Sequence, residues 1–137
     1  MVAHRRIHFH GESGERRREL LTAFTALPVW VTVVWCGRRH GVTEFTAREQ
    51  CLTRLVELAQ QGKVSRLVIE SRQDDRDDVR TVLRARAPRP PMVFEHRPGR
   101  DEPMLWVADG VTWAVGAGGA WRSLVEPVLR DIVQIQP

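Results

Sequence analysis

The sequence of 137 residues has few of the features that mark disulfide-rich or secreted proteins. It contains two cysteines, Cys36 and Cys51, a single lysine, Lys63, and no tyrosine. The two cysteines form no CxxC pair, which excludes a disulfide scaffold. The basic N-terminal stretch lacks the apolar core of a signal peptide. We therefore expect reduced thiols and a cytoplasmic protein.

Long hydrophobic runs are also missing. The two longest apolar stretches, Val29–Cys36 and Met104–Ala117, are too short to cross a bilayer, so we expect no membrane partner. Apolar residues make up 42% of the chain and charged residues 28%, which is a globular balance. The length suits one domain, and we predict a single α/β domain over residues 1–137.

Basic residues outnumber acidic ones by 21 to 17, for a formal net charge of +4. Because only one of the 21 is a lysine, the other 20 are arginines. Two interpretations stay open. A GC-rich genome favours arginine codons, and the guanidinium fork also matches phosphate oxygens. A modest positive charge permits nucleic-acid binding without requiring it.

Helical and strand patterns alternate along the chain. This alternation predicts an α/β fold in which helices flank a mixed sheet. Val29–Cys36 is apolar on both faces, which predicts a buried central strand. The expected helices are Glu15–Leu27, Thr46–Gln61, Asp74–Ala87, Met104–Ala117 and Trp121–Val128. The expected strands are Arg5–His10, Val29–Cys36, Val64–Glu70, Met92–His96 and Ile132–Ile135.

Glu70 is the first candidate site residue because it ends an apolar strand. Ligands of open α/β sheets bind beyond the carboxyl ends of the strands, where a carboxylate can hold a cation or a substrate. Glu70 can equally be a polar residue that marks the end of its strand and pairs with Arg72. Arg72 is in turn a candidate contact for phosphate.

Asp109 is the second candidate, as the only charge within about fourteen apolar residues. A buried carboxylate without a partner is costly, so this one must be paired, metal-bound or in contact with water. It can line a groove or form part of an exposed stripe. Helical spacing places on one face Glu102, Trp106, Asp109, Thr112, Trp113 and Gly116.

Acidic and histidine residues supply weaker metal candidates. In the run Gln73–Asp78, Asp74 and Asp77 share a helical face, and so do Asp75 and Asp78. Acidic residues also suit a helix N-terminus for structural reasons, but Asp74 or Asp77 follows Glu70 closely enough to be a metal ligand. His96 ends a predicted strand and is a further candidate. His8 and His10 would lie on one face of a strand, but a zinc site needs more ligands.

The segments LVIESRQDDRDD and EPMLWVADGVTWAVG, with RIHF and AWRSLVEPV, carry a family resemblance. The chain resembles a group of uncharacterised actinobacterial proteins, within a family of unknown function that has a predicted ribonuclease H-like fold. The resemblance implies a metal-dependent nuclease that acts on phosphodiesters with Mg²⁺ or Mn²⁺. It implies that Glu70 and Asp109 are the catalytic and metal-binding carboxylates.

One departure from this family changes the expectation. The family opens with a strand that carries Asp-Glu-Ser, whereas the nearest match here, Gly11–Ser13, has glycine at the aspartate position. Relative to the family, we therefore expect the first strands and the first acid to be missing, through truncation, a misplaced start or natural degeneration. The alternative is a catalytically degenerate module that binds nucleic acid or protein. An uncovered sheet edge also predicts a homodimer or a partner that donates a strand.

Overall fold

The computed structural model describes residues 9–37 and 41–136. The chain divides into two compact units. The first unit combines the chain up to Val33 with Pro98–Ile132, and the second contains Val34–Arg97 and the residues from Val133 onward. Within the described ranges, no helix is both long enough and apolar enough to cross a bilayer. Both cysteines are free thiols.

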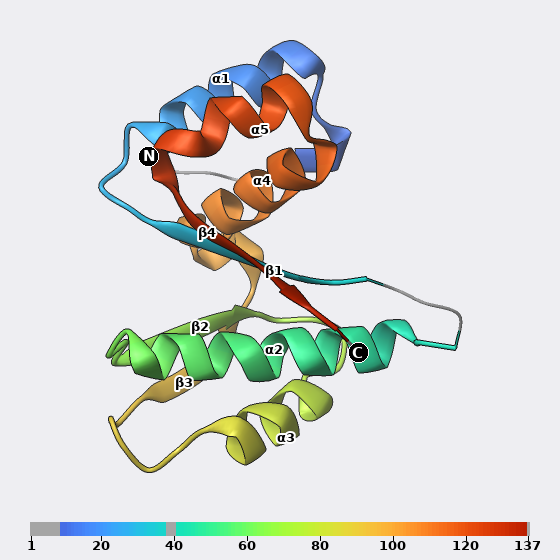
Figure 1. Ribbon diagram of the computed structural model, residues 1–137. Coiled ribbons are helices and arrows are strands. Elements are labelled where there is room, and N and C mark those ends of the chain that lie inside the picture. The colour runs from blue at the N-terminus through green and yellow to red at the C-terminus, as the bar shows by residue number, and fades with distance from the viewer. Residues whose placement is uncertain (1–8, 38–40, 137) are drawn as a thin grey trace. The chain divides into compact units, whose positions relative to one another are not determined.

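The first unit is built from helices (Figure 1). Its elements are η1 (Phe9–Gly11), α1 (Gly14–Thr25), η2 (Gly99–Asp101), α4 (Pro103–Ala117), α5 (Gly119–Val125) and η3 (Glu126–Val128). Ser13 caps the N-terminus of α1, since its hydroxyl accepts a hydrogen bond from the backbone N–H of Arg16 at 3.1 Å. The apolar faces of α1, α4 and α5 meet in one core that includes Leu21, Val111 and Val125.

The second unit contains a strand–helix–strand motif. β2 (Arg66–Glu70) and β3 (Val93–Arg97) pair in parallel, and α3 (Arg76–Ala85) connects them. The 18-residue helix α2 (Glu44–Gln61) precedes the motif and packs against α3 (Figure 1). The core contains Leu52, Val56, Val82 and Met92, with Leu67, Ile69 and Phe94 packed against it. Parallel strands need such a crossover, and a helix usually supplies it.

β1 (Val31–Cys36) pairs with β4 (Leu129–Ile135) in a separate two-stranded sheet. The division between the two units crosses both of these strands. Burial along β1 is incomplete, and the Trp35 side chain is exposed. The prediction of a buried central strand at Val29–Cys36 is therefore wrong, because the strand has one neighbour among the described residues and its side chains are mostly half-buried.

The alternation of helices and strands agrees with the sequence patterns, apart from one segment. Arg5–His10 was expected as a strand. Residues 5–8, which include His8, lie outside the described residues. Phe9 and His10 begin the 3-10 turn η1. Phe9 is buried there in the helical core, against α4. The strands form two two-stranded sheets where one mixed sheet was expected.

Candidate functional site

The strongest candidate site lies in the second unit, where a groove of about 410 Å³ runs between α2 and the start of α3. The lining is polar and highly charged. It contains five carboxylates, two guanidinium groups and one aromatic ring. The lining residues are Glu44, Phe45, Arg48, Glu49, Arg72, Gln73, Asp74, Asp77, Asp78 and Thr81.

Strand alternation explains which side chains of the parallel pair reach α3. Leu67 lies beside Phe94, and Ile69 lies beside His96, in the register of the two strands. Leu67, Ile69 and Phe94 all pack into the core beneath the helices. Since successive side chains of a strand point to opposite faces, His96 lies on the same face as Phe94 and is directed toward α3.

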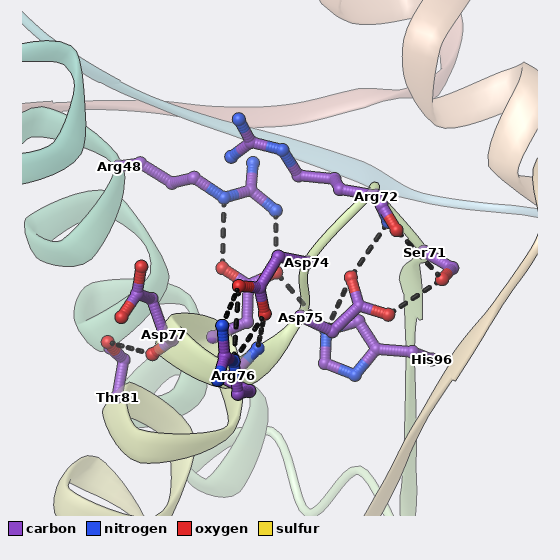
Figure 2. A network of polar contacts seen from close by, with 10 residues as sticks. Arg48, Ser71, Arg72, Asp74, Asp75, Arg76, Asp77, Thr81 and His96 are labelled. Carbon is purple, nitrogen blue, oxygen red and sulfur yellow. Dashed lines mark hydrogen bonds and ion pairs between the residues drawn. The ribbon is translucent and has the colours of Figure 1, made fainter.

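His96 meets two aspartates at the N-terminal end of α3, of which Figure 2 labels Asp75. Its Nε2 lies 3.1 Å from Oδ2 of Asp78 and 4.0 Å from Oδ1 of Asp75. One ligand atom from each of the three residues lies within 4.8 Å of the others. Asp78 is 7% exposed and His96 10% exposed. We refer to Asp75, Asp78 and His96 as the Asp–His cluster.

Asp78 also receives both prongs of a guanidinium from α2. Arg48 Nε lies 2.9 Å from Oδ1 of Asp78, and Arg48 Nη2 lies 2.8 Å from Oδ2. Burial alone would raise the pKa of Asp78, but the hydrogen bonds from Arg48 and His96 outweigh it, and the pKa is lowered. The same pairing raises the pKa of Arg48. The Asp78 carboxylate is therefore held in its charged form.

The loop between β2 and α3 orients the second aspartate of the cluster. The Asp75 carboxylate accepts hydrogen bonds from Ser71 Oγ at 2.6 Å and from the backbone N–H of Arg72 at 2.7 Å. These bonds, led by that of Ser71, lower the pKa of Asp75. Asp74 accepts from the backbone N–H of Arg76, which is the first residue of α3. Asp74 thereby satisfies the helix end, and Asp75 is left to face His96 (Figure 2).

Glu70 does not belong to the Asp–His cluster. It is the last residue of β2 and lies beside Arg97 in the parallel register. Because Ile69 faces the core beneath the helices, alternation places Glu70 on the opposite face of the β2–β3 pair. Its position at the carboxyl end of a strand agrees with the sequence, but its side chain and the cluster occupy different faces.

Asp77 and Arg72 both line the groove. Asp77 is exposed and lies 3.3 Å from Arg80, one turn further along α3. It does not belong to the cluster, since the aspartates that approach His96 are Asp75 and Asp78. Arg72 exposes its side chain at the groove while its backbone N–H holds Asp75. A phosphate role for Arg72 and a metal role for Asp77 stay predictions.

Asp109 belongs to the other unit, in the middle of α4. It lines a shallow groove of about 420 Å³ together with His10, Thr112, Trp113, Gly116 and Ala117. Four of the six lining residues come from the helical face that the sequence spacing predicted, namely Asp109, Thr112, Trp113 and Gly116. Trp106, expected on the same face, is instead buried, and its indole N–H donates to the Gly99 carbonyl at 2.7 Å.

Sequence reasoning did not single out Arg48, and it named Asp75 and Asp78 only as one of two alternative pairs. The three-residue spacing of Asp75 and Asp78 was the available signal. No local pattern marks Arg48, which is 30 residues from its partner. Comparison of the chain with protein-family models, curated proteins and solved structures gives no match.

Proposed function

We propose that the chain is a divalent-metal-dependent, nuclease-like protein that acts on phosphodiesters, with the cation held by the Asp–His cluster. The observation that carries the proposal is the convergence of three ligand atoms within 4.8 Å. They converge near the carboxyl ends of two parallel strands, where α/β proteins place their ligands. The ribonuclease H-like resemblance supports the same reaction class.

The donor set indicates which ion to test first. Two carboxylates and one imidazole are a mixed set of oxygen and nitrogen donors. Carboxylates suit Mg²⁺ and Mn²⁺, whereas Mg²⁺ disfavours imidazole and keeps a largely oxygen shell. We therefore place Mn²⁺ ahead of Mg²⁺. Two of the three side chains, those of Asp78 and His96, are largely buried.

A bound cation would polarise a phosphate oxygen and stabilise charge that develops during phosphodiester cleavage. The chain's own residues supply the remaining contacts. The exposed guanidinium of Arg72 can hold a second phosphate oxygen. Arg48 and Ser71 fix the orientation of Asp78 and Asp75 through hydrogen bonds to their carboxylates.

Glu70 and Asp109 keep a place in this proposal as carboxylates that the family resemblance implies. Glu70 immediately precedes Ser71, whose hydroxyl holds Asp75. Asp109 lines the groove of the other unit. Their contribution is tested with Glu70→Gln and Asp109→Asn in a nuclease assay, separately from the cluster.

Calorimetric titration with MnCl₂ tests the cation site. Saturable binding is expected for the wild-type chain and is expected to be lost in Asp75→Asn and in His96→Gln. Asp77→Asn is measured beside them, because the Asp77 carboxylate lines the groove but lies outside the cluster. Asp101→Asn, an exposed aspartate paired with Arg100 in the first unit, is the control. Absence of saturable binding by a folded wild-type chain would refute the proposal.

A non-catalytic module is the second candidate, and one observation favours it. Both oxygens of Asp78 already have protein partners, Arg48 and His96. A cation would have to displace the His96 contact, because Nε2 is the atom it needs. If the chain binds nucleic acid in EDTA as tightly as in MnCl₂, the degenerate module becomes the better description.

We also propose that the chain forms a homodimer or accepts a strand from a partner. The support is that each sheet of the described residues has only two strands, which leaves backbone groups at their outer edges for another strand to pair with. Sedimentation at micromolar concentration tests the idea. A monomer with no copurifying partner would contradict it.

A further inference from the structure

The groove beside the Asp–His cluster has an aromatic ring at its surface. Phe45 stands in the first turn of α2 and is 54% exposed. It lines the groove and is not part of the apolar core beneath α2. The exposed face of the ring can stack on another ring.

Helical spacing connects this ring to the Asp–His cluster. Phe45 and Arg48 are three residues apart, so their side chains lie on one face of α2. At 1.5 Å per residue, they are separated by about 4.5 Å along the helix axis. Arg48 binds Asp78 with both prongs. A ligand that covers Phe45 is thus within about one helical turn of the side chain that binds the cluster.

We propose that the groove binds single-stranded nucleic acid, with an unpaired base stacked on Phe45 and the adjoining phosphate directed toward the cluster. This inference rests on the proposed function, whose substrate class it names. Unpaired bases stack on aromatic side chains with little dependence on sequence, whereas a duplex keeps the faces of its bases covered. Gln73 and Arg72, on the other side of the groove, offer an amide for a base edge and a guanidinium for a phosphate.

The charges of the groove add a second requirement. Five carboxylates outnumber two guanidinium groups, so the lining by itself repels phosphate. A divalent cation at the cluster would offset part of this charge. We therefore expect nucleic-acid binding to depend on Mn²⁺. The five carboxylates belong to Glu44, Glu49, Asp74, Asp77 and Asp78.

Fluorescence anisotropy with a labelled, mixed-sequence RNA of about a dozen nucleotides tests the inference. The probe is measured single-stranded and annealed to its complement, in MnCl₂ and in EDTA. Stacking is worth about 1–3 kcal/mol per base, so Phe45→Ala is expected to weaken single-strand binding by about 5- to 150-fold. Phe45→Trp is expected to retain it. Tighter binding of the duplex than of the single strand would overturn the inference.

Leu83→Ala is the matched control, because Leu83 is also 54% exposed on a helix of the same unit but does not line the groove. It is expected to leave RNA binding unchanged. Calorimetry of Phe45→Ala with MnCl₂ separates the two claims, since the ring is not a ligand. If Phe45→Ala binds both Mn²⁺ and RNA as the wild type does, base stacking is refuted while the cation site stands. If the wild type binds no Mn²⁺, the proposed function fails first.

Discussion

Arg48 of α2 and Asp78 of α3 form a two-pronged ion pair, with nitrogen–oxygen distances of 2.9 and 2.8 Å. The acidic partner is almost fully buried, whereas the arginine is 38% exposed. The same carboxylate lies 3.1 Å from His96 of β3. Three elements that are separated in the sequence therefore share one charged group, and this group lies at the edge of the groove.

Removing the arginine is expected to destabilise the second unit. Arg48→Met leaves a buried carboxylate with His96 as its remaining side-chain partner, which costs about 2 kcal/mol of unfolding free energy once the exposure of Arg48 is allowed for. Urea unfolding measures the loss, and a double-mutant cycle with Asp78→Asn isolates the coupling.

Arg54 and Glu57 provide the control cycle. They form an exposed ion pair one turn apart on the same helix, at 3.1 Å. Exposed pairs of this kind contribute about 0.5 kcal/mol or less. A coupling energy for Arg48 and Asp78 no larger than that of Arg54 and Glu57 would show that the buried, two-pronged ion pair stabilises the fold no more than an exposed pair does.

The lowered pKa of Asp78 predicts how stability depends on pH. A carboxyl group whose pKa is lower in the folded than in the unfolded state stabilises the fold above the unfolded value, which is about 4. That contribution is lost as the pH falls through the folded pKa. We therefore expect the unfolding free energy to fall as the pH drops below about 4.

Asp78→Asn should reduce the slope of unfolding free energy against pH below about pH 4, because asparagine does not titrate. Part of the slope should remain, since the pKa of Asp75 is also lowered and the pKa of Asp74 falls to about 2. Urea unfolding at a series of pH values gives the slopes. Identical slopes for the wild type and Asp78→Asn would contradict the assigned pKa direction.

The parts of the site that the sequence predicted are those set by local spacing. The sequence predicted strands at Val64–Glu70 and Met92–His96, which overlap β2 and β3. The three-residue spacing put Asp75 and Asp78 on one face. What brings His96 to them is the parallel register, in which Ile69 lies beside His96. A sequence pattern indicates that a strand exists but not which residue of another strand lies beside it.

The incorrect expectations also have physical reasons. Val29–Cys36 has the composition of a central strand, yet apolar side chains on both faces do not by themselves supply two neighbouring strands. Phe9 falls in the strand expected at Arg5–His10. Its ring is buried against α4, so tertiary packing overrode the local preference.

Gln60 is a buried polar residue that holds a loop of the second unit. Its amide donates to the carbonyl oxygens of Ala87 and Pro90 at 2.9 and 3.0 Å, and its own oxygen accepts from the Ala87 N–H at 2.9 Å. Gln60→Leu leaves these backbone groups without that partner, and we expect a loss of about 2–3 kcal/mol. Thermal unfolding measures it. Gln61→Leu, on the exposed side of the same helix, should change stability by about 0.5 kcal/mol or less. Equal losses for the two variants would contradict a stabilising role for the Gln60 hydrogen bonds.

Two glycines of α4 provide an internally controlled test of packing in the first unit. A Cβ on Gly110 would lie 2.8 Å from Cε2 of Phe24 and 3.2 Å from Cε2 of Phe9, whereas a Cβ on Gly116 meets nothing within 4 Å. Gly110→Ala is therefore expected to cost about 1–3 kcal/mol, because both rings must move within a filled core.

Gly116→Ala should stabilise the protein by up to about 1 kcal/mol, since alanine restricts the unfolded chain and favours the helix. Both substitutions add the same methyl group to the same helix, so intrinsic helix propensity favours alanine at both positions. Opposite signs in urea unfolding can then come only from the surroundings. A stabilised Gly110→Ala variant would mean that α4 does not pack as closely on Phe24 and Phe9 as the structure describes.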